Sequence, residues 1–110
     1  MRHQMFRVAL AALAAGVILG HGPAFAAGDA AKGKAAFESC AVCHSPDSDE
    51  KKVGPGLKDL YKKDKMANGK KPTDASVRAK IDEGGGGMPP YKDMLSEPEK
   101  DDLIAYLKTL

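Results

Sequence analysis

The sequence predicts a small all-α domain of about four helices over residues 27–110. No segment in this range shows the alternation of apolar and polar residues that is typical of a strand. Several segments instead space their apolar residues three or four positions apart, which indicates helices. A domain of this length buries little apolar surface compared with the chain entropy that folding costs. We therefore expect something other than side chains to complete its core.

The first helix is predicted over residues 30–40, with Asp29 as its N-cap. Gly33 and Phe37 lie on the same face of this helix. A glycine inside a helix costs about 1 kcal/mol relative to alanine. Its presence at position 33 indicates that another backbone passes close to the helix there.

The second and third helices are predicted over residues 57–63 and 73–83. The second is short and follows a rigid turn at residues 54–56, which reads Gly-Pro-Gly. Thr73 is the expected N-cap of the third helix, and Gly84 is expected to end it.

The fourth helix is the clearest, because residues 96–99 form a capping box with a proline early in the first turn. Its apolar stripe consists of Leu103, Tyr106, Leu107 and Leu110. We expect the first and fourth helices to cross at Gly33, with Phe37 packed against Leu103 and Tyr106.

The most informative motif is Cys40-Ala41-Val42-Cys43-His44. A Cys-x-x-Cys-His run is typical of c-type haem attachment. The spacing allows the two thiols to form thioether bonds with the two vinyl groups of a haem. The adjacent His44 can then bind the iron from one face. The motif therefore predicts one covalent haem c held by Cys40, Cys43 and His44.

Three other interpretations of this motif are weaker. A redox dithiol usually lies in a βαβ context, and no strand pattern precedes Cys40. A zinc site needs four ligands, but there is no second cysteine pair, and His3 and His21 lie in the leader described next. A tight structural disulfide would leave His44 without a role.

Residues 1–26 are predicted to be a cleavable signal peptide. They have a positive start, an uncharged apolar run at residues 8–20, and the cleavage site Ala24-Phe25-Ala26. The alternative is an uncleaved anchor, but the apolar run is short for a membrane span. We therefore expect a periplasmic protein, without stable membrane insertion, that consists of residues 27–110.

An iron bound by His44 has a second axial position, and Met88 is the favoured ligand for it. Residues 84–87 are all glycine, which lets backbone approach a flat ring, and two prolines after Met88 fix the loop. Met66 and Met94 lack this setting, and a lone methionine is often only core filler. An open axial site is the remaining alternative.

Residues 28–110 resemble a monohaem class I c-type cytochrome. The resemblance is carried by the amino-terminal helix from Gly28 to Phe37, the haem motif, Val53 to Leu57, Gly87 to Tyr91, and the carboxyl-terminal segment Asp102 to Lys108. It implies a small cytochrome c fold with crossing terminal helices around one haem. It also implies that the Pro55 carbonyl accepts a hydrogen bond from His44. The usual tryptophan near a haem propionate is missing, and Tyr61, Asn68 and Arg78 are possible replacements.

The charge is balanced but unevenly distributed. The chain has a formal net charge of +2, and the leader contains Arg2 and Arg7 and no acid, so residues 27–110 are neutral. Lysines gather in the middle of the chain, at positions 51, 52, 58, 62, 63, 65, 70 and 71, whereas acids gather near its end. This polarity either orients the protein toward a charged partner or only solvates the surface. The basic segment does not indicate nucleic-acid binding, because Tyr61 is its only aromatic residue.

These features predict a monomeric one-electron carrier, not an enzyme, that docks transiently with respiratory redox partners such as an oxidase, reductase or dehydrogenase. One alternative is a haem enzyme or ligand sensor with a displaceable distal Met88. This alternative usually requires a polar distal residue, and residues 27–110 contain no histidine besides His44. Another alternative is a dedicated subunit of a larger complex.

Overall fold

The computed structural model describes residues 28–110 and, before them, Gly16 alone. The predicted signal peptide therefore lies outside the described residues, apart from that one glycine. Three α-helices and two single 3-10 turns follow one another in the described part: α1 (Ala30–Ala36), η1 (Phe37–Ser39), η2 (Leu60–Lys62), α2 (Asp74–Glu83) and α3 (Glu97–Leu107). No strand occurs among these residues, and the predicted all-α class is confirmed.

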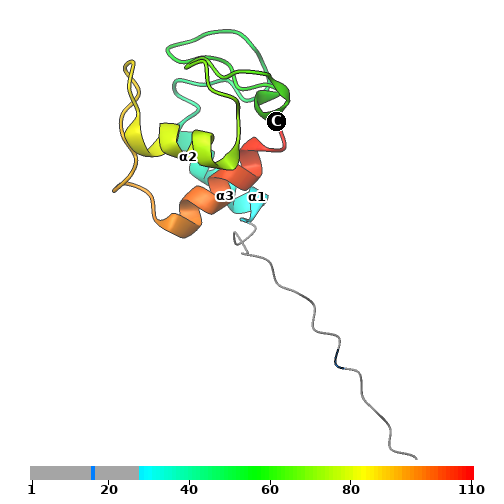
Figure 1. Cartoon of the computed structure of the whole chain (residues 1–110). Helices are drawn as coiled ribbons and strands as arrows, with labels where there is room; N and C mark the ends of the chain where they lie inside the picture. The colour runs from blue at the N-terminus through cyan, green and yellow to red at the C-terminus, as the bar shows by residue number, and fades with distance from the viewer. Residues whose placement is uncertain (1–15, 17–27) are drawn as a thin grey trace, which may run out of the picture.

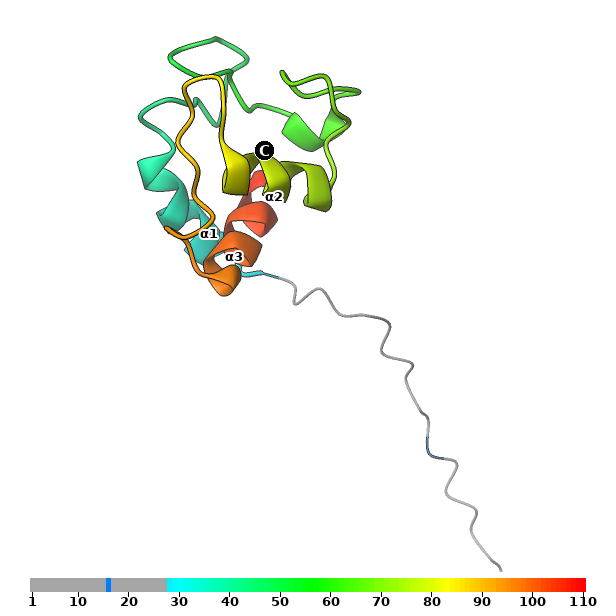
Figure 2. The ribbon, with the colours of Figure 1, turned by 60° about the vertical axis from the view of Figure 1, so that its left-hand side comes forward.

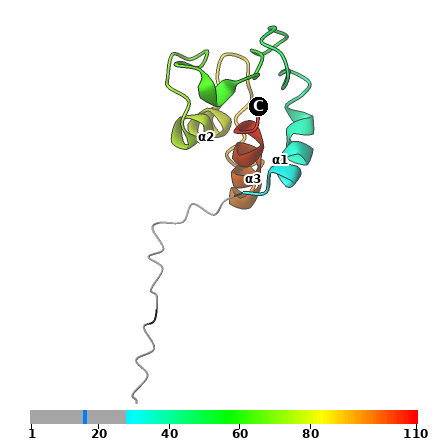
Figure 3. The same ribbon diagram turned by 90° about the vertical axis from the view of Figure 1, so that its right-hand side faces the viewer.

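Helix α1 packs along α3, and Figure 3 shows these two helices side by side. Gly33 is buried at their contact, where a Cβ would collide with the backbone of Asp102. One turn further on, the ring centroids of Phe37 and Tyr106 lie 5.3 Å apart with a tilted geometry. Such aromatic pairs contribute about 0.5–1.5 kcal/mol beyond their buried area. The predicted crossing at Gly33 is confirmed.

The expected helix caps are also present. Asp29 accepts hydrogen bonds from the backbone amides of Ala31 and Lys32 at the start of α1. Thr73 and Ser96 each form a reciprocal capping box, at the starts of α2 and α3. These side chains satisfy amides that the first turn of a helix leaves without partners.

The prediction of a second helix over residues 57–63 was too long. Only the 3-10 turn η2 forms there, because Asp59 adopts a left-handed conformation with φ of 55°. A non-glycine residue in this region interrupts a right-handed helix. The long connections between α1 and α2 therefore form irregular loops, which lie on the far side of the domain from the start of α1 (Figures 1 and 2).

The apolar core is small and lies between α1, α2 and α3. It consists of Phe37, Leu60, Val77, Ile81, Leu103, Ile104 and Leu107. Lys100 is also buried, at 1% exposure, and its ammonium lies 2.7 Å from Asp82 of α2 and 3.1 Å from Glu97. This buried cation links α2 to α3, because its partners come from both helices. Within residues 28–110, none of the helices combines the length and apolar character that a membrane span requires.

Candidate cofactor site

A cavity of about 580 Å³ opens beside the core. This volume falls within the range of about 300–1,000 Å³ that is usual for cofactor sites. Its walls are largely apolar, and they include the core residues Phe37, Leu60, Val77, Ile81, Leu103 and Leu107. The same side chains therefore belong both to the protein core and to the wall of the cavity.

The cysteines lie at one end of this cavity, on a turn that follows η1. The backbone amides of Cys43 and His44 both donate to the carbonyl of Cys40, at 3.1 and 2.9 Å. Because the backbone forms a helical turn here, both thiols and the imidazole lie at the cavity wall. The two thiols are free, and partial burial raises the pKa of the Cys40 thiol above its ordinary value.

A hydrogen bond to the backbone orients the imidazole of His44. Its Nδ1 atom lies 2.8 Å from the carbonyl oxygen of Pro55. With Nδ1–H as the donor, the unprotonated Nε2 is left free to bind a metal. Gly54 supports the same ring, because a Cβ at this position would collide with the imidazole. From sequence, Gly54 was recognisable as part of a turn and of the segment Val53 to Leu57, but its contact with the imidazole was not.

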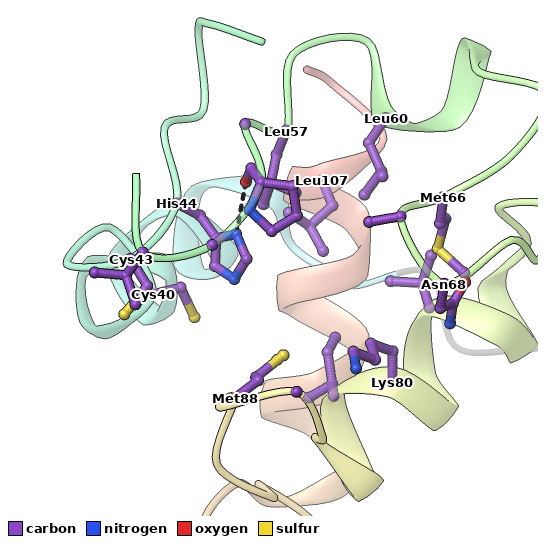
Figure 4. Close-up of a pocket in the computed structure, with 18 of the residues that line it drawn as sticks. Cys40, Cys43, His44, Leu57, Leu60, Met66, Asn68, Lys80, Met88 and Leu107 are labelled. Carbon is purple, nitrogen blue, oxygen red and sulfur yellow. Dashed lines mark hydrogen bonds between the residues drawn. The ribbon is translucent and has the colours of Figure 1, made fainter. Parts of the chain in front are cut away.

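Met88 lies across the cavity from His44. In Figure 4 the imidazole and the thioether occupy opposite sides of the same space, with Cys40 and Cys43 at one end. The Met88 backbone pairs with Gly85, with N–O distances of 2.9 and 3.2 Å, and so forms a tight turn after α2. All four glycines at positions 84–87 have positive φ, which only glycine adopts readily.

The other two methionines of residues 27–110 are placed differently. Met94 is 66% exposed and does not line the cavity. Met66 lines it, but Figure 4 shows it beside Asn68, at the end away from the cysteines.

The three residues that were possible contacts of a haem propionate lie in different parts of the structure. Asn68 lines the cavity, whereas Tyr61 and Arg78 do not. Arg78 instead forms ion pairs with Glu97 and Asp101 of α3. The Tyr61 hydroxyl is buried, and burial raises its pKa well above the ordinary value, with a further contribution from the nearby Asp74 carboxylate.

These residues fit a covalent haem. The cavity has apolar walls for a porphyrin, two thiols at one end, an imidazole nitrogen free on one side and a thioether on the other. Within the described residues, no group of three or more His, Cys, Asp and Glu side chains is arranged to hold a metal ion directly.

Comparisons with known proteins agree with this fit. The family model described as Cytochrome c matches residues 30–110. Cytochrome c6 from Synechocystis sp. is 38% identical over 82 residues, which cover 74% of this chain and 65% of that protein. The chain thus spans slightly less than two thirds of the length of this relative.

Among solved structures, cytochrome c6 from the diatom Phaeodactylum tricornutum has a similar fold. The TM-score is 0.59 with 26% sequence identity, and the match covers 74% of this chain and 93% of the diatom protein. Together with the cavity and its cysteine pair, these matches show that the chain belongs to the cytochrome c family, as a monohaem class I c-type cytochrome with one covalently bound haem c.

Proposed function

We propose that the protein is a soluble one-electron carrier, not an enzyme, in which His44 and Met88 are the two axial ligands of the haem iron. The observation that carries the proposal is the position of these two side chains on opposite sides of a cavity with the cysteines at its end. The bound haem c supplies the reversible one-electron couple of its iron. A six-coordinate iron changes oxidation state with little ligand movement.

The residues of the chain determine how that couple behaves. The Pro55 carbonyl fixes the tautomer and orientation of His44 and makes the imidazole a stronger donor. The Met88 thioether favours the ferrous state and so raises the reduction potential. The apolar wall excludes water from the iron, which also disfavours the more highly charged ferric state.

Electrons are proposed to pass at the edge next to the cysteines. Val42 and Val53 are 74% and 76% exposed there, and the loop that carries Val53 is bonded to Cys43 through the Gly54 amide. Lys51 and Lys52 immediately precede Val53. An exposed apolar patch with a basic rim suits brief docking to acidic redox proteins, and we propose that these are partners in a respiratory chain.

The compartment and the oligomeric state belong to the same proposal. Removal of residues 1–26 as a signal peptide would deliver the chain of residues 27–110 to the periplasm, where cytochromes c are matured. We propose that it acts there as a monomer, without insertion into the membrane. Amino-terminal sequencing of the exported protein checks the cleavage site after Ala26.

The ligand assignment is tested by an optical spectrum and an intact mass of the exported protein. We expect the mass of the chain plus one haem, a low-spin six-coordinate spectrum, and the weak far-red band of a ferric haem with a thioether ligand. Met88→Ala should remove that band and allow carbon monoxide to bind the ferrous protein. Met94→Ala is the control and should leave both unchanged. A far-red band that survives in Met88→Ala would refute the assignment of Met88.

A further inference from the structure

We propose that Lys80 is a positioning residue for the axial ligand Met88. Its ammonium group holds the glycine turn, residues 84–87, which leads into Met88. This inference rests on the proposed His44 and Met88 ligation and adds a residue that holds one of the two ligands in place. Figure 4 shows Lys80 on α2, at the wall of the same cavity as Met88.

The contacts of Lys80 are specific. Its Nζ donates to the carbonyl of Gly84 at 3.0 Å and to the carbonyl of Gly85 at 3.2 Å. The second of these carbonyls also accepts the backbone amide of Met88, at 3.2 Å. One oxygen atom therefore joins the lysine ammonium to the backbone of the ligand residue. Among the described residues, no other side chain donates a hydrogen bond to the glycine turn.

The glycine turn needs such a fastening because of its composition. Four consecutive glycines lose more conformational entropy on ordering than any other four residues would. Three of them, Gly85 to Gly87, are exposed and contribute no side-chain packing. The far end of the loop is already attached to α2, since the Tyr91 amide donates to the carbonyl of Ile81 at 2.9 Å. At the near end the Gly84 amide donates to the Lys80 carbonyl at 2.8 Å, and the Lys80 ammonium adds the side-chain contacts to Gly84 and Gly85.

A simpler role for Lys80 would be to cap the carboxyl terminus of α2. A cation in the last turn of a helix is favourable in any case. That role accounts for the bond to Gly84, which lies at the C-cap, but not for the bond to Gly85, which lies beyond it. It also predicts a loss of helix stability only, with no change at the iron. The two roles therefore differ in what they predict for ligand exchange.

The test measures imidazole binding to the ferric, haem-loaded protein by optical titration, because imidazole must displace Met88. Lys80→Met keeps the aliphatic part of the side chain and removes the donor and the charge. We expect it to raise the apparent association constant for imidazole about tenfold, which corresponds to about 1.4 kcal/mol. We also expect it to weaken the far-red band, whereas Lys80→Arg should restore much of the wild-type behaviour.

Lys34→Met is the matched control, because Lys34 is the basic residue in the last turn of α1 and does not line the cavity. It should bind imidazole as the wild type does. If Lys80→Met also binds imidazole as the wild type does, the positioning role is wrong, even if the variant melts at a lower temperature.

A double variant separates this inference from the ligand assignment. In a Met88→Ala background the ligand is already absent, so adding Lys80→Met should leave imidazole affinity unchanged. An equal increase in both backgrounds would show that Lys80 acts on access to the cavity and not through Met88. If Met88→Ala alone leaves imidazole affinity unchanged, the proposed ligand is wrong and the failure lies there.

Discussion

The Nδ1 atom of His44 lies 2.8 Å from the carbonyl oxygen of Pro55, and the same imidazole packs against Gly54. The loop at residues 53–57 thus fixes the ring both by a hydrogen bond and by close packing. Because the acceptor is a backbone carbonyl, the conformation of this loop, and not the side chain of Pro55, determines the orientation of the ligand.

We therefore predict that Gly54→Ala impairs the site more than Pro55→Ala does. A Cβ at position 54 would collide with the imidazole, and such overpacking typically costs about 1–3 kcal/mol. Pro55→Ala keeps the accepting carbonyl and serves as the control. The measurement is the yield of haem-loaded protein and its far-red band. Equal yields and spectra for the two variants would contradict the packing argument.

A second prediction concerns the crossing of α1 and α3. Gly33→Ala would gain about 1 kcal/mol in helix propensity if the position were exposed. Here the added Cβ meets the backbone of Asp102, which cannot move without displacing α3. We expect the clash to dominate and to lower the free energy of unfolding by about 1–3 kcal/mol, measured by denaturant titration. Ala35→Gly, on the exposed side of α1, should lose only about 1 kcal/mol.

Much of the fold could be predicted from sequence because its determinants are local. Caps such as Asp29 and Ser96 bond to amides two or three residues away, so a short window of sequence contains the whole interaction. The crossing at Gly33 was predictable for a related reason: a glycine that weakens its own helix indicates a close neighbour.

What the sequence did not reveal depends on the folded path of the backbone and not on a short local pattern. The burial of Lys100 requires Asp82, which lies on another helix, and nothing near position 100 indicates it. Asp59 interrupts the expected second helix by adopting a left-handed conformation, although its sequence context is compatible with a helix. The Lys80 contacts likewise appear only once the glycine turn folds back toward α2.

The third prediction is a dependence of stability on pH through Glu97. Hydrogen bonds from Lys100 and then Arg78 hold the pKa of this carboxyl below its ordinary value. A carboxyl whose pKa is lower in the folded state contributes stability above its unfolded pKa, about 4.3 for Glu. That contribution is lost as the pH falls through the lowered, folded pKa.

Glu97→Gln should therefore melt at a lower temperature than the wild type at neutral pH, and the difference should vanish in strong acid. The effect is modest because the side chain is 71% exposed. Thermal unfolding followed by circular dichroism between neutral pH and about pH 2 measures it. Glu38→Gln is the control, since Glu38 has no ion pair among residues 28–110. A difference that stays constant over the whole pH range would refute this linkage.

A fourth prediction is that the polypeptide without its cofactor is marginally folded. Most of the apolar core also lines the cavity, so these side chains lose a packing partner when no haem is attached. We expect a Cys40→Ala, Cys43→Ala variant, produced without haem maturation, to unfold with a broad transition of low cooperativity. The haem-loaded wild type is the reference for calorimetry and circular dichroism. A sharp transition at the wild-type temperature would show that the protein core suffices alone.

The last prediction concerns the sign of the charge at the proposed docking edge. Lys51 and Lys52 lie next to the exposed Val53, and Lys51 also lines the cavity. Small redox reagents sense this charge directly: the oxidation rate with anionic ferricyanide should fall as salt is added, and the rate with a cationic cobalt complex should rise.

Lys51→Glu combined with Lys52→Glu should weaken or reverse both trends. Lys34→Glu changes the net charge by the same amount per residue on α1, outside the cavity wall, and should have a smaller effect. If Lys34→Glu changes the salt dependence as much per substituted lysine as the double variant does, net charge alone governs the encounter and electrons do not enter at this edge.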